Sequence, residues 1–306
     1  MIYETFIDKS FHPKTLRTIE MANRIIAEFQ ADGYTLTLRQ LYYQFVARGL
    51  RENTDKSYKS LGKIISEARL AGLISWDGIE DRGRSLSPWL IQERERAVFK
   101  DIERRFALDV WQRQDVYIEA WIEKDALSAV LERPCGQFRV PFMACKGYLS
   151  SSEAYQAGKR FEAMLEDGRR CVLLHLGDHD PSGIDMTRDN SERVHQLAYA
   201  VPGQVEVRRL ALNMDQVEQY DPPTNPTKIT DSRADDYIRR FGGKSWELDA
   251  LDPSVIGALV TEAVEEFIDP DIWNDTIQEE RERRVPLAKV YSEWPTILKF
   301  IEEELS

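Results

Sequence analysis

The sequence predicts an α/β protein in which a helical N-terminal unit precedes a domain built on a central parallel sheet. Two patterns predict this class. Apolar residues recur at helical spacing from residue 14 to residue 74. From residue 116 to residue 212, short strand-like runs alternate with helical patterns, which is typical of right-handed βαβ units and therefore of a parallel sheet. The length of 306 residues exceeds the usual size of one domain and favours two.

The N-terminal unit is expected to hold three helices, over residues 14–30, 38–49 and 56–74. Gly33 supplies a stop for the first helix, and Thr35 or Thr37 can cap the second. Residues 74–85 (ISWDGIEDRGRS) are broken at two glycines and are expected to form a small hairpin. Three helices closed by a basic hairpin form the helix-turn-helix or winged-helix pattern of DNA-binding proteins. A helical bundle that contacts only protein fits the pattern about equally well.

The second domain is expected to follow a charged helical connector over residues 86–112. Its strands are predicted at residues 116–123, 140–147, 171–177 and 204–212, and the helices between them at residues 123–131, 151–165 and 182–200. Residues 221–236 are rich in Pro, Asp, Thr and Asn, which indicates a surface loop. Helical patterns continue from there to the end of the chain.

The charge of the chain is uneven. The net charge is −12, which argues at first against a nucleic-acid partner. Residues 34–105, however, hold 14 Lys and Arg against 10 Asp and Glu, a net of +4, whereas residues 251–306 hold 5 against 14, a net of −9. We therefore expect any polyanion to meet the N-terminal third, and the acidic C-terminal segment to be a solvated helical face.

Cysteine usage and hydropathy favour a cytoplasmic protein. Cys135, Cys145 and Cys171 are widely spaced and form no C-x-x-C motif, so we expect reduced, buried thiols and no structural zinc. The N-terminus lacks the features of a signal peptide, and no stretch approaches the ~20 apolar residues of a membrane span. No membrane partner is expected.

Acidic residues follow two of the predicted strands. Asp178 and Asp180 come directly after the apolar run CVLLHLG, and Glu123 ends the first strand. The carboxyl ends of parallel strands share one edge of the sheet, where sites are built. Carboxylates held together repel one another, and a divalent cation relieves the conflict; oxygen ligands suit Mg²⁺ or Mn²⁺. Glu119 is the second choice and is expected to face solvent or a neighbouring element, while His179 is expected to face away. The alternative is that these acids only form turns or cap helices, which would explain one such motif but explains several in this order poorly.

These motifs resemble a known family. Glu123-Lys124 after one strand and GDHDPSG after a later one are similar to the Toprim domain of topoisomerases, bacterial primases and several nucleases. KGY at residues 146–148 and GGKSWELDAL at residues 242–251 resemble more particularly the A subunit of topoisomerase VI and its relative that starts meiotic recombination. The short chain is most similar to the stand-alone forms called Mini-A. Three departures are Gln40 in place of an acid, Leu149 in place of Pro, and a displaced Lys before ELDAL.

The resemblance implies a fold, a reaction and partners. It implies a winged-helix (CAP-like) domain over residues 34–112, after an extension over residues 1–33, and a Toprim domain over residues 113–306. The family's tyrosine motif, an Arg followed four residues later by the reactive Tyr, matches Arg39 and Tyr43. Tyr43 would attack a DNA phosphorus and form a phosphotyrosine bond.

In the family, the metal is Mg²⁺, which Glu123, Asp178 and Asp180 would bind, with Mn²⁺ also possible, and Arg39 would grip the phosphate. The partners implied are double-stranded DNA and a second copy of the chain, with the tyrosine of one subunit serving the acids of the other. The protein would then be cytoplasmic and associated with the nucleoid. The chain carries no ATP-site signature, and a separate ATPase subunit of the B type is not excluded.

Two other functions stay open. In a Toprim nuclease, metal-activated water attacks and Tyr43 is structural. In a non-catalytic DNA-binding protein, the acids serve no reaction. A helical wheel distinguishes the two tyrosines: Tyr42 shares the apolar face of its helix, whereas Tyr43 falls off that face on the side of Arg39. Tyr42 is therefore expected to be a packing residue and Tyr43 the candidate nucleophile.

Overall fold

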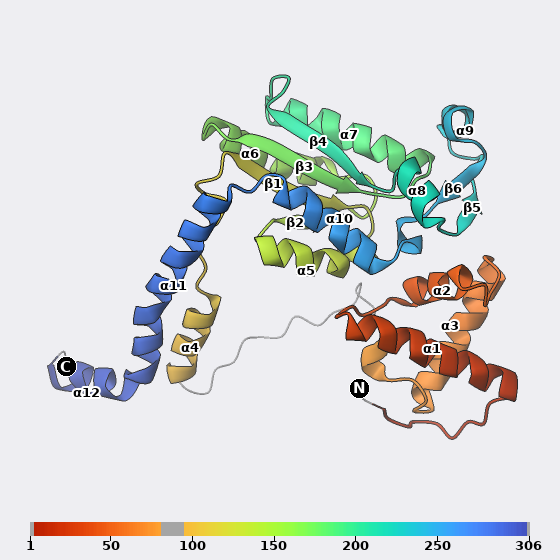
Figure 1. The fold of residues 1–306 in the computed structure, drawn as a ribbon, viewed down its shortest axis with the longest axis horizontal. Coiled ribbons are helices and arrows are strands. Elements are labelled where there is room, and N and C mark those ends of the chain that lie inside the picture. The colour runs from red at the N-terminus through yellow and green to blue at the C-terminus, as the bar shows by residue number, and fades with distance from the viewer. Residues whose placement is uncertain (1–2, 81–94, 305–306) are drawn as a thin grey trace.

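The computed structural model describes residues 3–80 and 95–304 of the chain (Figure 1). Its helices are α1 Pro13–Ala31, α2 Leu38–Ala47, α3 Asp55–Leu70, α4 Glu95–Arg105, α5 Ser128–Phe138, α6 Ser151–Glu166, α7 Pro181–Leu197, α8 Met214–Tyr220, α9 Ala234–Phe241, α10 Pro253–Glu265, α11 Pro270–Ser292 and α12 Trp294–Glu304. Its strands are β1 Val116–Ile122, β2 Phe142–Ala144, β3 Arg170–Leu176, β4 Val205–Ala211, β5 Thr224–Pro226 and β6 Lys244–Trp246. The predicted α/β class is confirmed.

The three N-terminal helices pack around one core of their own, in which Ile25 of α1, Leu41 of α2 and Leu61 of α3 are fully buried. Thr37 caps α2 as expected, because its side chain accepts a hydrogen bond from the backbone N–H of Gln40. In turn, the side-chain oxygen of Gln40 accepts a hydrogen bond from the backbone N–H of Thr37. Helix α1 thus shares a core with α2 and α3.

Residues 74–80 are the described part of the expected hairpin over residues 74–85, and they form no strand pair with one another. Residues 76–78 form a single 3-10 turn at the first of the two expected breaks, and Ile79 makes one parallel bridge to Leu36. The side chain of Ser75 caps this turn by accepting a hydrogen bond from the backbone N–H of Asp77. Residues 81–85 lie outside the described residues.

The main sheet is parallel throughout, with the strand order β2-β1-β3-β4. Helices cover both faces, as parallel sheets require. Alternate residues of β1 and β3, such as Ile118 and Leu174, pack with α5 and α10. The residues between them, such as Trp121 and Leu173, pack with α6 and α7 on the other face (Figure 1). All three cysteines are buried free thiols, as expected.

The C-terminal helices extend from the end of the molecule opposite the helical unit (Figure 1). Helix α4, in the connector, packs along α11 and not on the helices that precede it in sequence. Glu280 of α11 holds this arrangement in place, since its carboxylate pairs with Arg139 at 2.5 Å and accepts a hydrogen bond from the backbone N–H of Leu108 at 2.7 Å. Most side chains of α11 and all those of α12 are at least partly exposed. No helix of the described ranges is both long and apolar enough to cross a membrane.

Close packing of α6 on α7 depends on a glycine. A Cβ on Gly158 would lie 2.4 Å from the Cβ of Leu197 and 2.9 Å from its carbonyl carbon. We expect Gly158→Ala to lower the free energy of unfolding by about 1–3 kcal/mol, because overpacking outweighs the better helix propensity of alanine. The matched control is Gly136→Ala on α5, where no atom lies within 4 Å of the new Cβ. Urea unfolding followed by circular dichroism measures both, and a Gly158→Ala variant as stable as the control would contradict this packing.

Candidate active site

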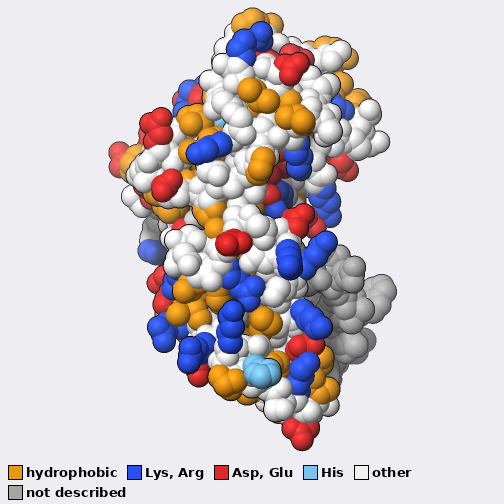
Figure 2. Space-filling view, turned by 90° about the vertical axis from the view of Figure 1, so that its right-hand side faces the viewer, with side chains coloured by type: hydrophobic (Ala, Val, Ile, Leu, Met, Phe, Trp, Pro, Cys, Tyr) orange, Lys and Arg blue, Asp and Glu red, His pale blue; other side chains and the backbone are white. Residues whose placement is uncertain are grey.

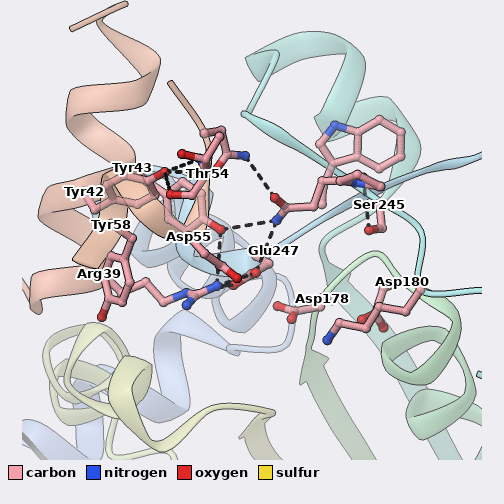
Figure 3. A pocket seen from close by; sticks show the side chains of 15 residues that line it. Arg39, Tyr42, Tyr43, Thr54, Asp55, Tyr58, Asp178, Asp180, Ser245 and Glu247 are labelled. Carbon is pink, nitrogen blue, oxygen red and sulfur yellow. Dashed lines mark hydrogen bonds and ion pairs between the residues drawn. The ribbon is translucent and has the colours of Figure 1, made fainter. Parts of the chain in front are cut away.

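A cavity of about 430 Å³ lies where the helical unit meets the carboxyl edge of the sheet (Figure 3). Residues of α2 and α3 form one wall, and the turn between β3 and α7 forms another together with β5 and β6. Arg39, Tyr43, Asp178 and Asp180 all line it. The sequence places the tyrosine and the aspartates far apart along the chain, yet the fold brings them to one cavity within one chain.

Both tyrosines of α2 are buried, Tyr42 with 4% and Tyr43 with 2% of the residue exposed. The expectation that Tyr43 lies off the core is therefore wrong. The sheet domain covers the side of α2 that carries Tyr43, and a helical wheel of α2 alone does not include that contact. The hydroxyl of Tyr42 is held in the helical unit: it donates to the carbonyl of Glu52 at 3.0 Å and accepts from the backbone N–H of Thr54 at 2.8 Å. Tyr42 is thus a packing residue, as expected.

The hydroxyl of Tyr43 faces donors from both units. It accepts hydrogen bonds from Arg39 at 3.5 Å and from the side-chain amide of Asn225 at 3.4 Å. Burial and the nearby charge of Glu247 raise its pKa to about 12. The free side chain is therefore almost fully protonated at neutral pH. The two donors would stabilise a phenolate once its proton has left.

Asp178 belongs to a network of charges. Its carboxylate pairs with the ammonium of Lys124 at 2.9 Å and accepts a hydrogen bond from the backbone N–H of Leu248 at 2.8 Å. The same ammonium binds Glu247 at 3.0 Å and Asp249 at 2.7 Å. Burial raises the pKa of Asp178, and the charge of Lys124 opposes that change.

Glu123 and Asp180 are the other two predicted acids of this sheet edge. Glu123 accepts a hydrogen bond from the backbone N–H of Asp178 at 2.9 Å, and a Cβ on residue 177 would lie 2.9 Å from the same carboxylate oxygen, so a larger residue there would push the Glu123 side chain aside. Burial and the charge of Asp178 raise the pKa of Glu123 to about 7. Asp180 caps α7 by accepting hydrogen bonds from the Gly183 backbone at 2.7 Å and the Ser182 hydroxyl at 3.0 Å.

The donor chemistry of these acids fits a divalent cation, although a ready-made metal cluster is not found among the described residues. In this structure the ammonium of Lys124 supplies the positive charge beside Asp178. Three basic groups face five acidic groups here, so acids exceed bases by two when all are ionised: the bases are Arg39, Lys124 and Arg209, and the acids are Glu123, Asp178, Asp180, Glu247 and Asp249. Because its pKa is raised to about 7, Glu123 is partly protonated near neutral pH, and a Mg²⁺ ion, which prefers oxygen ligands, would favour the ionised form.

Several residues of the site were missed by reasoning from the sequence. Glu247 and Asp249 lie in the segment GGKSWELDAL, which resembles the family but whose acids had no predicted role. Asn225 lies in the expected loop over residues 221–236, part of which forms strand β5. Arg209 of β4 is partly buried, and it donates to the carbonyls of Gly177 and Asp178 at 3.0 and 2.6 Å, so it fixes the turn that carries the aspartates. For Glu247 and Asp249, the available signal in the sequence was the spacing of two acids two residues apart, E-L-D.

Glu119 and His179 both have structural roles. Glu119 is buried and does not face solvent: its carboxylate binds Arg160 at 2.7 and 2.9 Å and accepts a hydrogen bond from the indole of Trp121 at 2.8 Å. Its expected contact with a neighbouring element is made by α6. His179 packs among aromatic rings, including that of Trp246, and its Nδ1 lies 2.7 Å from the hydroxyl of Tyr237.

The raised pKa of Glu123 predicts a pH dependence of stability. Between the ordinary value of 4.5 and about 7, the folded protein retains a proton that the unfolded chain has lost, so this group's stabilising contribution is lost as the pH rises. We expect the wild type to lose up to about 3 kcal/mol relative to Glu123→Gln over this range. Urea unfolding of both proteins from pH 4 to pH 8, roughly the window in which the linkage applies, measures the difference. A wild type whose stability relative to Glu123→Gln stays constant or rises with pH would contradict the burial of an acid beside Asp178.

No protein-family model matches this chain, and neither a curated protein nor a solved structure matches it.

Proposed function

We propose that this protein cleaves double-stranded DNA by metal-assisted transesterification, as a cytoplasmic, nucleoid-associated enzyme similar to the A subunit of topoisomerase VI. In this proposal, the helical unit is the winged-helix domain and the sheet domain is the Toprim domain. The observation that carries it is that Tyr43 and Arg39 share one cavity with Asp178 and Asp180. A nucleophile, a phosphate-binding guanidinium and carboxylates for a cation are the groups that phosphodiester cleavage needs.

The reaction would transfer one phosphoester bond. The Tyr43 oxygen attacks the phosphorus, a bond from phosphorus to a deoxyribose oxygen breaks, and the strand leaves with a free hydroxyl. The Tyr43 hydroxyl, whose pKa is about 12, gives its proton to solvent, and the departing deoxyribose oxygen takes one proton from solvent, so the proton count balances. Arg39 and Asn225 donate toward the tyrosine oxygen while it carries the charge. Glu123, Asp178 and Asp180 would bind Mg²⁺, or Mn²⁺, which supplies charge neutralisation at the phosphate.

Positive charge on the helical unit supports DNA as the substrate. Lys56, Lys59 and Lys63 are exposed on α3 at a spacing that places them along one side of the helix. Lys228 lines the cavity itself. Figure 2 shows Lys and Arg side chains gathered over the lower half of the face drawn, where the helical unit lies. Lysines in this arrangement replace counterions along a phosphate backbone.

The arrangement of subunits belongs to the proposal as well. The resemblance implies a homodimer in which each tyrosine serves the acids of its partner. Here Tyr43 and the aspartates of one chain line a common cavity, so the geometry does not require a second chain to complete the site. A homodimer would still serve to cut both strands of a duplex.

One observation favours a second candidate function, a Toprim nuclease. The pKa of Glu123 is raised to about 7, which suits a base that takes a proton from water at neutral pH, whereas the pKa of Tyr43 is raised to about 12. Water attack leaves no covalent bond between protein and DNA, so a trapped adduct distinguishes the two reactions.

The tyrosyl reaction predicts a protease-sensitive adduct. We expect supercoiled DNA incubated with protein and Mg²⁺ or Mn²⁺, then stopped with detergent, to give linear or nicked DNA that enters a gel freely only after protease digestion. Tyr43→Phe should abolish both product and adduct, because no oxygen remains to attack. Tyr42→Phe is the matched control, since it removes the neighbouring hydroxyl, and we expect it to cleave.

The outcomes for Tyr43→Phe separate the candidates. Cleavage that persists in this variant without an adduct would replace the transesterase by the nuclease. Loss of cleavage in Tyr42→Phe alone would show that Tyr42, and not Tyr43, is the nucleophile. Loss in both variants is resolved by their melting curves, because Tyr42 makes hydrogen bonds within the helical unit whose removal costs about 1 kcal/mol.

The excess of acids over bases in the site predicts that both the thermal stability of the protein and its cleavage of DNA depend on a metal ion. We expect Mg²⁺ to stabilise the wild type by about 2.7 kcal/mol at a hundredfold excess over Kd, and so to raise its melting temperature. Chelation with EDTA should reverse this stabilisation and stop cleavage. The double variant Asp178→Asn/Asp180→Asn should lose both effects. Asp185→Asn on α7 is the control, since that carboxylate pairs with Arg233 at 2.9 Å outside the cavity. Cleavage by the double variant at the wild-type rate would refute the assignment of the metal.

A further inference from the structure

Two cations of the site bind a single carboxylate. Arg39 holds Glu247 with two nitrogens: Nη2 lies 2.5 Å from one oxygen, and Nε lies 2.9 Å from the other. That second oxygen lies 3.0 Å from the ammonium of Lys124. Glu247 therefore places two oxygens and one negative charge between a planar guanidinium and an ammonium. A phosphodiester presents the same features, two non-bridging oxygens that share one negative charge.

We propose that Arg39 and Lys124 form a phosphodiester subsite, which the carboxylate of Glu247 occupies until a DNA backbone displaces it. The inference rests on the proposed function for the identity of the ligand. Figure 3 shows Glu247 between the tyrosine side of the cavity and Asp178.

The surroundings of Glu247 suit a group that can leave. Its side chain is 23% exposed and that of Arg39 is 42% exposed, so water reaches the pair. Lys124 keeps Asp178 and Asp249 as partners once Glu247 has left, so its ammonium is never unpaired. Within the described ranges, Glu247 is the one carboxylate that pairs with Arg39, and an incoming phosphate would restore the bidentate contact that the guanidinium loses.

Occupation by phosphate would also prepare the nucleophile. Arg39 lies one helical turn before Tyr43 and donates to its hydroxyl at 3.5 Å, so a phosphate held by the same guanidinium lies beside the attacking oxygen. The phosphate brings one negative charge as the carboxylate of Glu247 moves away, so the exchange adds no further negative charge beside the Tyr43 hydroxyl. Displacement of one anion by another thereby couples DNA binding to the positioning of the phosphorus beside the tyrosine.

The test measures DNA binding without cleavage, so its result does not depend on the covalent chemistry. Full-length protein carrying Tyr43→Phe is titrated in EDTA against a short fluorescein-labelled duplex, at several salt concentrations. Adding Glu247→Gln should tighten binding about tenfold and steepen the salt dependence by about 0.9 for each additional phosphate that the protein neutralises. Glu247→Asp keeps the charge but shortens the reach, and should tighten binding less.

A matched control separates competition from general repulsion. Asp55 lines the same cavity, and among the described residues its carboxylate is not paired with Arg39. Asp55→Asn removes the same charge, and we expect it to tighten binding about twofold at most. Adding Arg39→Gln should cancel the effect of Glu247→Gln and leave that of Asp55→Asn unchanged.

Two results would overturn the subsite. Equal tightening by Glu247→Gln and Asp55→Asn would show general repulsion only, and weaker binding by a Glu247→Gln variant that melts like the parent would make Glu247 a structural residue. If Tyr43→Phe still cleaves DNA while Glu247→Gln tightens binding, the transesterase fails and the subsite stands. Absence of DNA binding by every variant would refute both.

Discussion

The ion pair between Arg39 and Glu247 joins the helical unit to the sheet domain. It lies at the start of a chain of charges that continues through Lys124 to Asp178. Beside it, Ala250 packs into the core of the helical unit, so apolar contact and charge act on the same junction. Breaking a partly buried pair is costly when a partner is left without a counter-charge. Glu247 keeps Lys124 as a second partner, and a phosphate on Arg39 would replace the charge that the guanidinium loses. The position of Tyr43 over the sheet edge depends on this junction.

Backbone geometry on the sheet side leaves little choice of residue where the carboxylates lie. A Cβ on Gly183 would lie 2.2 Å from the carbonyl of Asp178, so α7 can begin this close to the strand only with glycine there. Arg209 supports the same turn by donating to backbone carbonyls, and in the part of the chain that the structure describes it hydrogen-bonds to no carboxylate. Its partly buried charge is offset by the nearby acids Glu123, Asp178 and Asp180. Removing those acids would therefore leave a partly buried guanidinium without a compensating charge, so the stability of the turn depends on the acids that follow the strands.

Sequence patterns predict those parts of the fold that local spacing controls. Helical periodicity, the cap at Thr37 and the alternation of strand and helix all have local causes, and the structure confirms them. Contacts between units have no local signal. The burial of Tyr43 comes from the sheet domain folding over α2, and Asn225 reaches its hydroxyl from a segment that composition marks as a loop. Glu247 is found only when residues more than 200 positions apart are brought together, as the separation of 208 between the two partners shows.

The excess of acid at the site sets the order in which its ligands can bind. Without a cation, the carboxylates repel an entering phosphate, and the net charge of −12 adds to that repulsion at long range. The lysines of α3 lie on the other unit, so in the proposed function they would hold DNA first, away from the acids. A phosphate that exchanges with Glu247 in the proposed subsite would bring one negative charge as the carboxylate moves away. Because that exchange would leave the excess of two acids unchanged, one divalent cation would offset it both before and after DNA binds.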